Sequence, residues 1–255
     1  MSEQILIDVT GAVMTVRMNR PEKKNALTRA MYTEMTTALR RADEDAAVRV
    51  VLLRGTDDCF TSGNDIVDFM QAPPTDETSP AFQFLRAVVA AKKPLVAAVT
   101  GPAVGIGTTM LLHCDLVYAG ASARLHLPFI NLALVPEGGS SLLLPQMLGH
   151  VRAAELLMLG EPFDAPTAQR YGIVNAVLPD EEVQAKALAV AQALAAKPPA
   201  AVQTTKAMLK RDQQAALDAT IAYEAGLFAQ RLQSPEAAEA FQAFMERRKP
   251  DFSKF

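Results

Sequence analysis

Two short apolar runs constrain the fold of this 255-residue chain more than any other feature. Val48–Arg54 is predominantly apolar and is closed by Gly55, and Leu95–Val99 is apolar throughout. Runs of this length that end at turn residues are typical of buried strands. Segments with a helical pattern lie between these strands and after them, so strands alternate with helices. This alternation predicts a domain of the α/β class.

The segments around these strands extend the prediction. Ile5–Val9 and Ala12–Met18 alternate apolar and polar residues around Gly11, which predicts a β-hairpin. Thr28 precedes a helical pattern and is a candidate N-cap. The other expected elements are a helix over 28–45, a mobile loop over 71–80, a helix over 81–91, a glycine-containing turn over 101–107, a helix over 107–113, and strands near Leu116–Ala119 and Arg124–His126.

The chain becomes rich in alanine and in helix-forming residues after residue 178. Helices are expected near 180–196, 199–209, 213–231 and 235–247. We therefore predict two parts, a core over 1–195 and a C-terminal helical region over 196–255. The helix near 213–231 carries an apolar stripe that requires a partner surface, either the rest of its own chain or another subunit. The members of this stripe are Leu217, Ile221, Glu224, Leu227 and Phe228.

Composition excludes several classes of function. The chain has 28 acidic and 25 basic residues and a formal net charge of −3, so it lacks the basic surface expected of a protein that binds nucleic acid. Two cysteines cannot form a disulfide framework, and His113, His126 and His150 do not have the spacing of metal ligands. We therefore expect no metal site. An acid–base catalyst of this composition would use a carboxylate.

The sequence also bears on location. The N-terminal residues do not have the pattern of a signal peptide, and no apolar run approaches the roughly 20 residues of a membrane span. A cytoplasmic protein without a membrane partner is therefore the expectation. Cys59 and Cys114 are then expected as small core residues.

Three segments differ from a plain core pattern. Cys59–Ile66 follows the first buried strand and places backbone N–H groups at the end of a sheet, where α/β proteins bind ligands. Gly101–Thr109 follows the second strand and leads into a helix start, which offers unpaired N–H donors. Ala133–Ser141 carries Glu137 between apolar residues and a Gly-Gly pair. Taken alone, each segment also fits a structural role: a turn with Asp65 as a helix cap, tight strand–helix packing, or a glutamate that favours a helix dipole.

In this order and spacing, the three segments resemble the crotonase, or enoyl-CoA hydratase/isomerase, superfamily. Two further segments share the resemblance: Asn19–Leu27, which is similar to the family's N-R-P-x-x-x-N-A-L signature, and the tail Phe244–Phe252. The resemblance covers essentially the whole chain. It implies a core of repeated ββα units wound as a spiral, with a C-terminal helical trimerisation region. It also implies an acyl-CoA thioester substrate and a homotrimer, or a hexamer made of two trimers.

The resemblance assigns roles to individual residues as well. Members of the family stabilise a thioester enolate with two backbone N–H groups, which correspond here to Asn64 and Ile106. Coenzyme A is part of the substrate, so no separate cofactor is expected. The basic tail either ends a solvated helix or reaches the CoA phosphates through Lys249 or Arg248. The residues implied to contact CoA or the acyl group are Lys24, Ala26, Ser62, Gly63, Asp65, Phe129 and Lys249.

The acid–base groups favour one reaction of the family. Its hydratases hold water with two glutamates, and the positions that correspond to them here are Thr109 and Phe129, neither of which is a carboxylic acid. Glu137 resembles the single base of Δ3-Δ2-enoyl-CoA isomerases, which convert a 3-enoyl-CoA to trans-2-enoyl-CoA. Two kinds of alternative to an isomerase remain. The chain could catalyse weak hydration, thioester hydrolysis or another crotonase-type reaction, or it could be an acyl-CoA-binding subunit without catalytic activity. Apolar neighbours would raise the pKa of Glu137, and a nearby helix start would lower it.

Overall fold

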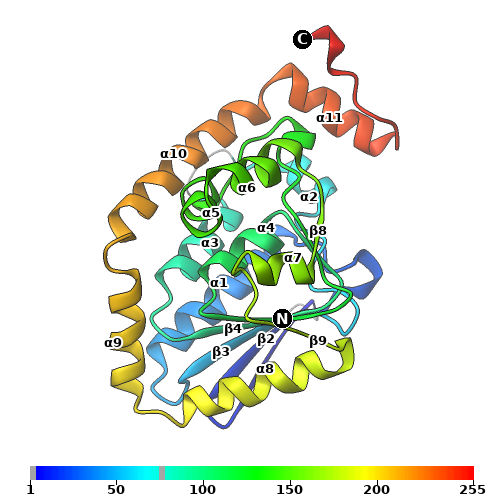
Figure 1. Cartoon of the computed structure of the whole chain (residues 1–255). Coiled ribbons are helices and arrows are strands. Elements are labelled where there is room, and N and C mark those ends of the chain that lie inside the picture. The colour runs from blue at the N-terminus through cyan, green and yellow to red at the C-terminus, as the bar shows by residue number, and fades with distance from the viewer. Residues whose placement is uncertain (1–3, 75–77) are drawn as a thin grey trace.

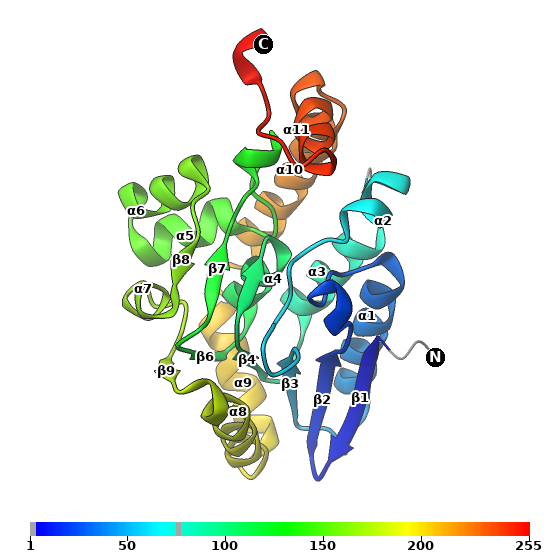
Figure 2. The ribbon, with the colours of Figure 1, turned by 90° about the vertical axis from the view of Figure 1, so that its right-hand side faces the viewer.

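The central element of the fold is a six-stranded sheet (Figures 1 and 2). The computed structural model describes residues 4–74 and 78–255. The strand order is β1-β2-β3-β4-β6-β9; β1 and β2 are antiparallel, and the other neighbouring strands are parallel. The predicted hairpin and both predicted buried strands are confirmed. The strands are β1 (Ile5–Thr10), β2 (Val13–Met18), β3 (Val50–Arg54), β4 (Leu95–Val99), β6 (Leu116–Gly120) and β9 (Ala176–Leu178).

Both faces of this sheet are covered, which explains why its central strands are apolar along their length. Val50 and Leu52 point toward α8 (Asp180–Ala195), while Val51 and Leu53 belong to the larger core on the opposite face. That core contains α1 (Arg29–Glu44) and α3 (Pro80–Ala90). Figure 1 shows α8 below the sheet and these two helices above it.

A second sheet of three strands stands beside the first. It has the order β5-β7-β8, formed by β5 (Pro102–Val104), β7 (Arg124–His126) and β8 (Phe163–Asp164). The prediction of a turn over 101–107 is therefore wrong in its middle, where β5 pairs with β7. This pairing depends on residues more than twenty positions away, so local glycine and proline content did not reveal it. The helix predicted over 107–113 is α4 (Ile106–Thr109), followed by a 3₁₀ turn over Met110–His113.

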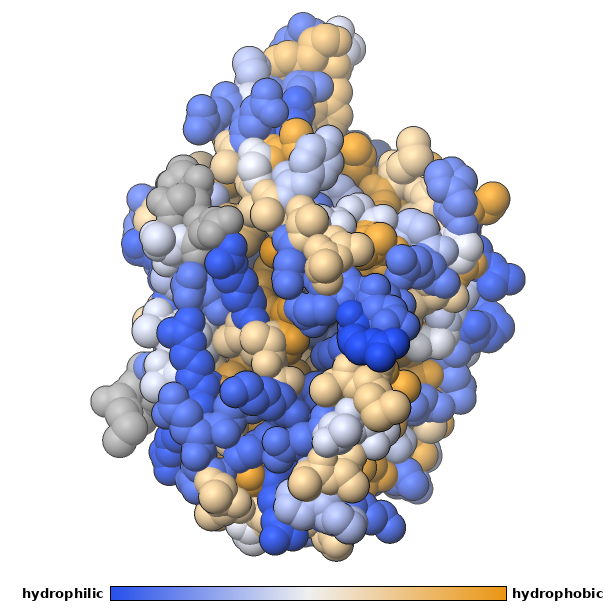
Figure 3. Space-filling model, turned by 90° about the vertical axis from the view of Figure 1, so that its left-hand side faces the viewer, coloured by the Kyte–Doolittle hydropathy of each residue, from blue (hydrophilic) through white to orange (hydrophobic). Residues whose placement is uncertain are grey.

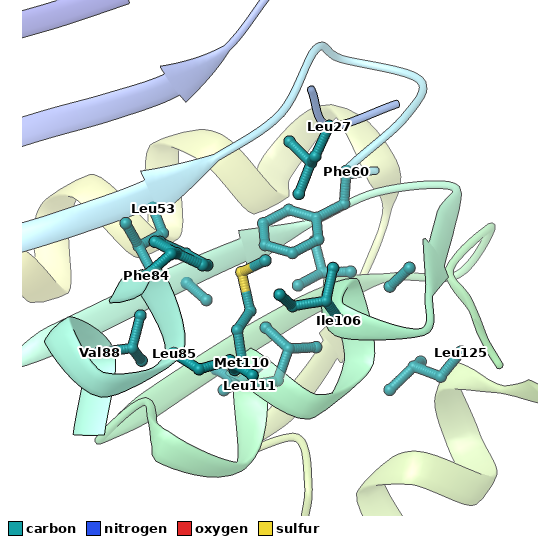
Figure 4. Packing of buried hydrophobic residues seen from close by; sticks show 14 of the residues in the cluster. Leu27, Leu53, Phe60, Phe84, Leu85, Val88, Ile106, Met110, Leu111 and Leu125 are labelled. Carbon is teal, nitrogen blue, oxygen red and sulfur yellow. The ribbon is translucent and has the colours of Figure 1, made fainter. Parts of the chain in front are cut away.

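Side chains from separate segments meet in the larger core. Figure 4 shows Phe60, Ile106 and Met110 close together, and all three are at most 1% exposed. Phe60 lies in the segment after β3, whereas Ile106 and Met110 lie in and directly after α4. Because buried side chains pack at nearly crystalline density, this contact fixes the segment after β3 relative to α4.

The C-terminal helices are α9 (Pro199–Lys210), α10 (Gln214–Leu232) and α11 (Pro235–Met245), and with α8 they confirm the four helices predicted there. They run along the outside of the molecule from the end of α8 to the C-terminus (Figure 1). Phe228 on α10 and Phe241 on α11 both contact Phe69 on α2 (Ile66–Gln71), so aromatic packing fixes these helices to the core. Leu217, Ile221, Glu224 and Phe228 are buried, so the stripe on α10 packs within its own chain.

The remaining elements are short. The loop predicted over 71–80 includes residues 75–77, which lie outside the described part of the chain; α2 ends at Gln71, the first residue of the predicted range, and α3 begins at Pro80, its last. The division at residue 195 stays a prediction. The short elements are α2 (Ile66–Gln71), α5 (Ser140–Leu148), α6 (His150–Ala154), a π-helical turn over Glu155–Leu159, α7 (Ala165–Arg170), and 3₁₀ turns over Pro21–Lys23, Ile130–Leu132 and Phe252–Lys254.

Candidate active site

A cavity of about 650 Å³ opens where the three singled-out segments meet α11 and the tail. This volume is within the range of small-molecule sites. Lys23 and Arg248 line it, whereas Lys24, Lys249 and Glu137 are not among its lining residues. The other residues named from the sequence lie in its wall: Ala26, Ser62, Gly63, Asn64, Asp65, Ile106 and Phe129.

Among the described residues, the backbone N–H groups of Asn64 and Ile106 in this wall have no protein partner. Around Asn64, Leu27 donates to the Gly63 carbonyl and Asp65 donates to the Leu27 carbonyl, which leaves the N–H of Asn64 between them. Ile106 is the first residue of α4, where a helix leaves its N–H groups unsatisfied. Within residues 4–74 and 78–255, neither N–H donates a hydrogen bond to another protein group. Two such donors on one cavity can bind a carbonyl oxygen or the oxyanion derived from it.

Arg20 and Asp65 hold the first of these donors in place. Arg20 donates from Nη1 to Asp65 Oδ2 at 2.7 Å and to the carbonyl of Ala26 at 2.9 Å. Asp65 also caps α2, since its Oδ1 accepts from the N–H groups of Val67 and Asp68. Asp65 therefore has the structural role that its position before a helix allowed, and it also lines the cavity.

Asn25 connects the N-terminal signature to the segment after β3. Its side chain is fully buried and donates to the carbonyls of Cys59 and Phe60 at 2.7 and 3.2 Å. In return, the hydroxyl of Thr61 donates to the carbonyl of Asn25 at 2.6 Å. In the sequence, this asparagine is marked only as part of the N-terminal signature. The structure shows that it ties the segment preceding Asn64 to the rest of the wall.

Glu137 lies behind the cavity wall and is 5% exposed. The hydroxyl of Thr109 donates to its Oε1 at 3.0 Å, and Ile106 on the same helix and Leu134 on its own segment line the cavity. Burial raises the pKa of Glu137, the Thr109 hydrogen bond lowers it, and the charge of Glu224 raises it, with a result of about 7. The sequence left open whether the pKa of Glu137 is raised or lowered, and burial, which raises it, has the larger effect. A carboxylate with this pKa can take up and release a proton near neutral pH.

Tyr32 is a site residue that the sequence analysis did not single out. Its hydroxyl donates to Oδ1 of Asn64 at 2.6 Å, and its ring is buried beside Phe84. Burial, the charge of Glu137 and the charge of Asp68 raise the pKa of this phenol well above its usual value, so it stays a neutral donor. No local signal marks Tyr32, because an aromatic residue on the inner face of a helix has the ordinary core pattern.

Within the described residues, no group of three or more histidine, cysteine, aspartate or glutamate side chains is placed to hold a metal ion. His113 is buried, and burial lowers its pKa to about 4. Its Nε2 lies 2.7 Å from the carbonyl of Gly138. Among the helices that the structure describes, none is long and apolar enough to cross a membrane.

Comparison with known proteins identifies the family of this chain. The family model for enoyl-CoA hydratase/isomerase matches residues 8–254. The chain therefore belongs to the enoyl-CoA hydratase/isomerase family of acyl-CoA enzymes, and its fold is the crotonase fold.

Among curated relatives, the chain is similar both to an isomerase and to a hydratase. It is 33% identical over 253 residues to enoyl-CoA delta isomerase 2 of Homo sapiens, a match that covers 96% of this chain and 64% of that protein. It is also 33% identical over 252 residues to 2,3-dehydroadipyl-CoA hydratase of Escherichia coli, covering 98% of both. The chain thus spans less than two thirds of the human relative.

Two solved structures are closely similar over their whole length. OdaA of Pseudomonas aeruginosa is 51% identical, with a TM-score of 0.95, and the match covers 96% of this chain and 100% of OdaA. An enoyl-CoA hydratase/isomerase from Pseudoalteromonas atlantica is 38% identical, with a TM-score of 0.93, and the match covers 98% of this chain and 100% of that one.

Proposed function

We propose that this chain is an enoyl-CoA isomerase that converts a 3-enoyl-CoA to trans-2-enoyl-CoA. Glu137 removes a proton from C2, and the electron pair of that C–H bond moves toward the thioester oxygen to give a dienolate. The N–H groups of Asn64 and Ile106 stabilise the oxyanion, a contribution of roughly 2.7–4 kcal/mol per donor in comparable sites. The protonated Glu137 then returns the proton to C4, and the new double bond lies between C2 and C3.

The observation that carries this proposal is the position and pKa of Glu137. Thr109, which donates to Glu137, lies three residues after Ile106 on α4, a rise of about 4.5 Å along the helix. Thr109, the residue that donates to the base, is therefore about one helical turn from a proposed oxyanion donor. A pKa of about 7 matches the requirement that one group both take and return a proton. Phe129, at the position of a hydratase glutamate, leaves an apolar wall there.

Substitution of the base tests the assignment. General bases contribute about 10²–10⁴-fold, so Glu137→Gln is expected to lower kcat for 3-hexenoyl-CoA by at least about 100-fold. Binding of an acyl-CoA, measured by calorimetry, is expected to persist because Glu137 is not in the cavity wall. Glu155→Gln, at an exposed glutamate far along the chain, is the matched control. Turnover by Glu137→Gln within about twofold of the wild type would contradict the role of Glu137.

The main alternative is hydration, since a hydratase is among the relatives at equal identity. Following conjugation of 3-hexenoyl-CoA and hydration of crotonyl-CoA in parallel separates the two reactions. A rate of isomerisation above the rate of hydration supports the proposal. A rate of hydration above the rate of isomerisation would show instead that the chain is a hydratase. Release of free CoA indicates a thioesterase, and binding without turnover indicates a non-catalytic subunit.

We also propose that the CoA phosphates bind at the basic side of the cavity. Lys23 and Arg248 line it, and Lys24 and Lys249 are their immediate neighbours in the chain. Arg248 is held by Glu239, whose Oε1 accepts from Nη1 at 2.5 Å. Lys249→Ala and Lys24→Ala are each expected to raise KM for acyl-CoA with little change in kcat, and an unchanged KM would remove that lysine from the site.

The proposed assembly is a homotrimer or a hexamer made of two trimers. Met208, Leu209 and Tyr223 on α9 and α10 are 70, 78 and 69% exposed, and such apolar groups are typical of interfaces. Figure 3 shows the side of the molecule that carries these helices, where apolar residues lie among hydrophilic ones. Sedimentation equilibrium is expected to give three or six times the chain mass of 27.4 kDa, and a monomer would contradict the proposal. A cytoplasmic location stays a prediction of the sequence.

A further inference from the structure

A buried carboxylate outside the cavity contacts the segment that carries the proposed base. Glu224, on α10, is 4% exposed. Its Oε2 accepts from the N–H of Gly139 at 2.6 Å, and its Oε1 accepts from the N–H and the hydroxyl of Ser141 at 3.0 and 2.6 Å. All three donors lie two to four residues after Glu137. None of the ion pairs found within the described residues includes Glu224.

These hydrogen bonds compensate for the burial of the charge. Burying a carboxylate without a cation is costly unless strong hydrogen bonds replace its water. Gly139 and Ser141 lie at the N-terminus of α5, where unpaired N–H groups and the helix dipole both favour an anion. Glu224 therefore serves as the cap that α5 lacks, since Gly139 at the N-cap position has no side chain to cap it.

The packing around this contact is tight. Gly139 has a positive φ of 76°, and a Cβ built there would collide with Cδ1 of Leu217, which lies on α10 two turns before Glu224. Helix α10 thus lies directly against the backbone that follows Glu137. The turn itself is closed by Ser140, whose N–H and hydroxyl both donate to the carbonyl of Glu137, at 3.1 and 2.7 Å.

The side chain of Glu137 faces groups from several elements. Thr109 on α4 donates to it, and Tyr32 on α1 is close enough for its phenol to be influenced by the Glu137 charge. Glu224 on α10 bonds the residues that follow Glu137 and acts on it through its charge. After burial, which is the larger cause, Glu224 raises the pKa of Glu137, whereas the Thr109 hydrogen bond lowers it.

The remaining ionisable neighbours contact the turn through its backbone. His113 bonds the Gly138 carbonyl, and burial keeps its pKa near 4, so its ring is neutral at working pH. Lys210 on α9 donates to the carbonyl of His113 at 3.2 Å. Of these groups, Glu224 is the one whose side-chain carboxyl accepts hydrogen bonds from the backbone N–H groups of the turn.

We propose that Glu224 is a positioning residue, which holds the turn that carries Glu137 in place behind the cavity wall through its hydrogen bonds to Gly139 and Ser141. This inference rests on the proposed role of Glu137 as the base. It assigns to the C-terminal helical region a part in the reaction, because α10 supplies the anchor for a residue 87 positions earlier in the chain. The fixed charge also keeps Glu137 a better proton acceptor.

Glu224→Gln tests both effects. The amide retains one acceptor oxygen but turns its NH₂ group toward a backbone donor, so the turn shifts. A misplacement near 1 Å can cost about 100-fold in rate. We expect kcat to fall by at least about tenfold, KM to change by less than about threefold, and the acid limb of the kcat profile to move to lower pH. Asp218→Asn, at an exposed carboxylate of the same helix, is the control and is expected to match the wild type.

Glu224→Asp separates position from charge. It keeps the anion but draws it back by one methylene, so kcat is expected to fall while the acid limb stays at the wild-type pH. Wild-type kcat and an unchanged pH profile in Glu224→Gln would overturn the proposal. If that variant does not fold, Ser141→Ala, which removes one of the three donors, decides the question, and an unchanged kcat there has the same consequence.

A measurement without turnover distinguishes failure of this inference from failure of the proposed function. The stability difference between Glu137 and Glu137→Gln proteins, followed against pH, reports the pKa of Glu137 whether or not the chain isomerises anything. The same stability difference is then measured in proteins that also carry Glu224→Gln. There it is expected to become constant at a lower pH than in the wild-type background, because the pKa of Glu137 is lower. An identical plateau pH in both backgrounds would refute the electrostatic part, even in a protein that proved to be a hydratase.

Discussion

The burial of Glu137 allows a quantitative prediction of how the free energy of unfolding depends on pH. The side chain is 5% exposed, and its pKa in the folded protein is about 7, compared with 4.5 for an ordinary glutamate. The folded state therefore holds this proton more tightly than the unfolded state does. The stability that this proton gives to the folded state is fully present below about pH 4.5, and it is lost as the pH rises toward 7.

Glu137→Gln removes this dependence while it keeps the shape of the side chain. The amide oxygen still accepts from Thr109, so this hydrogen bond is preserved. Below about pH 4.5 both proteins carry a neutral group and are expected to be equally stable. A pKa difference between 4.5 and about 7 corresponds to about 3 kcal/mol. Above pH 7 the variant is therefore expected to be more stable than the wild type by about 3 kcal/mol.

Urea denaturation between about pH 4 and about pH 9 measures this difference, at one protein concentration because assembly adds to stability. Subtracting the two free energies of unfolding removes the contribution of groups that both proteins share. Glu161→Gln, at an exposed position, is the control and is expected to show no trend. Parallel curves for the wild type and Glu137→Gln over the whole range would refute the claim that burial dominates the electrostatics of Glu137.

Three further variants test the surrounding site. Gly63→Ala is expected to destabilise the fold by about 1–3 kcal/mol in urea melts, because φ is +86° and a Cβ would lie 2.8 Å from a backbone carbonyl oxygen. Tyr32→Phe removes the hydroxyl that donates to Asn64. It is expected to lower kcat about fivefold, which corresponds to a typical hydrogen bond, and to leave KM unchanged. An unaltered kcat would exclude a role of Tyr32 in holding Asn64. Thr109→Val removes a hydrogen bond to ionised Glu137, so the acid limb of kcat is expected to move to higher pH.

Much of the wall of the cavity was predictable because it is made of backbone. Turns and helix starts leave N–H groups unpaired, which marked the two segments that contain Asn64 and Ile106, and the resemblance to the family assigned the two donors to these residues. The alternative reading of Asp65 as a helix cap was also correct, since caps follow from spacing within a few residues. The strand at Pro102–Val104 was missed because its partner, β7, lies far along the chain.

The sequence by itself determined the alternation of strands and helices typical of an α/β domain, and it determined that Thr109 and Phe129, which are not carboxylic acids, stand at the positions that the resemblance assigns to hydratase glutamates. These properties follow from periodicity and from residue identity. Tertiary structure alone decided the pKa of Glu137 and brought Tyr32 and Glu224 to the site. The physical reason is that desolvation and charge–charge interaction depend on which distant segments pack around a group, and here α1 and α10 approach from opposite ends of the chain.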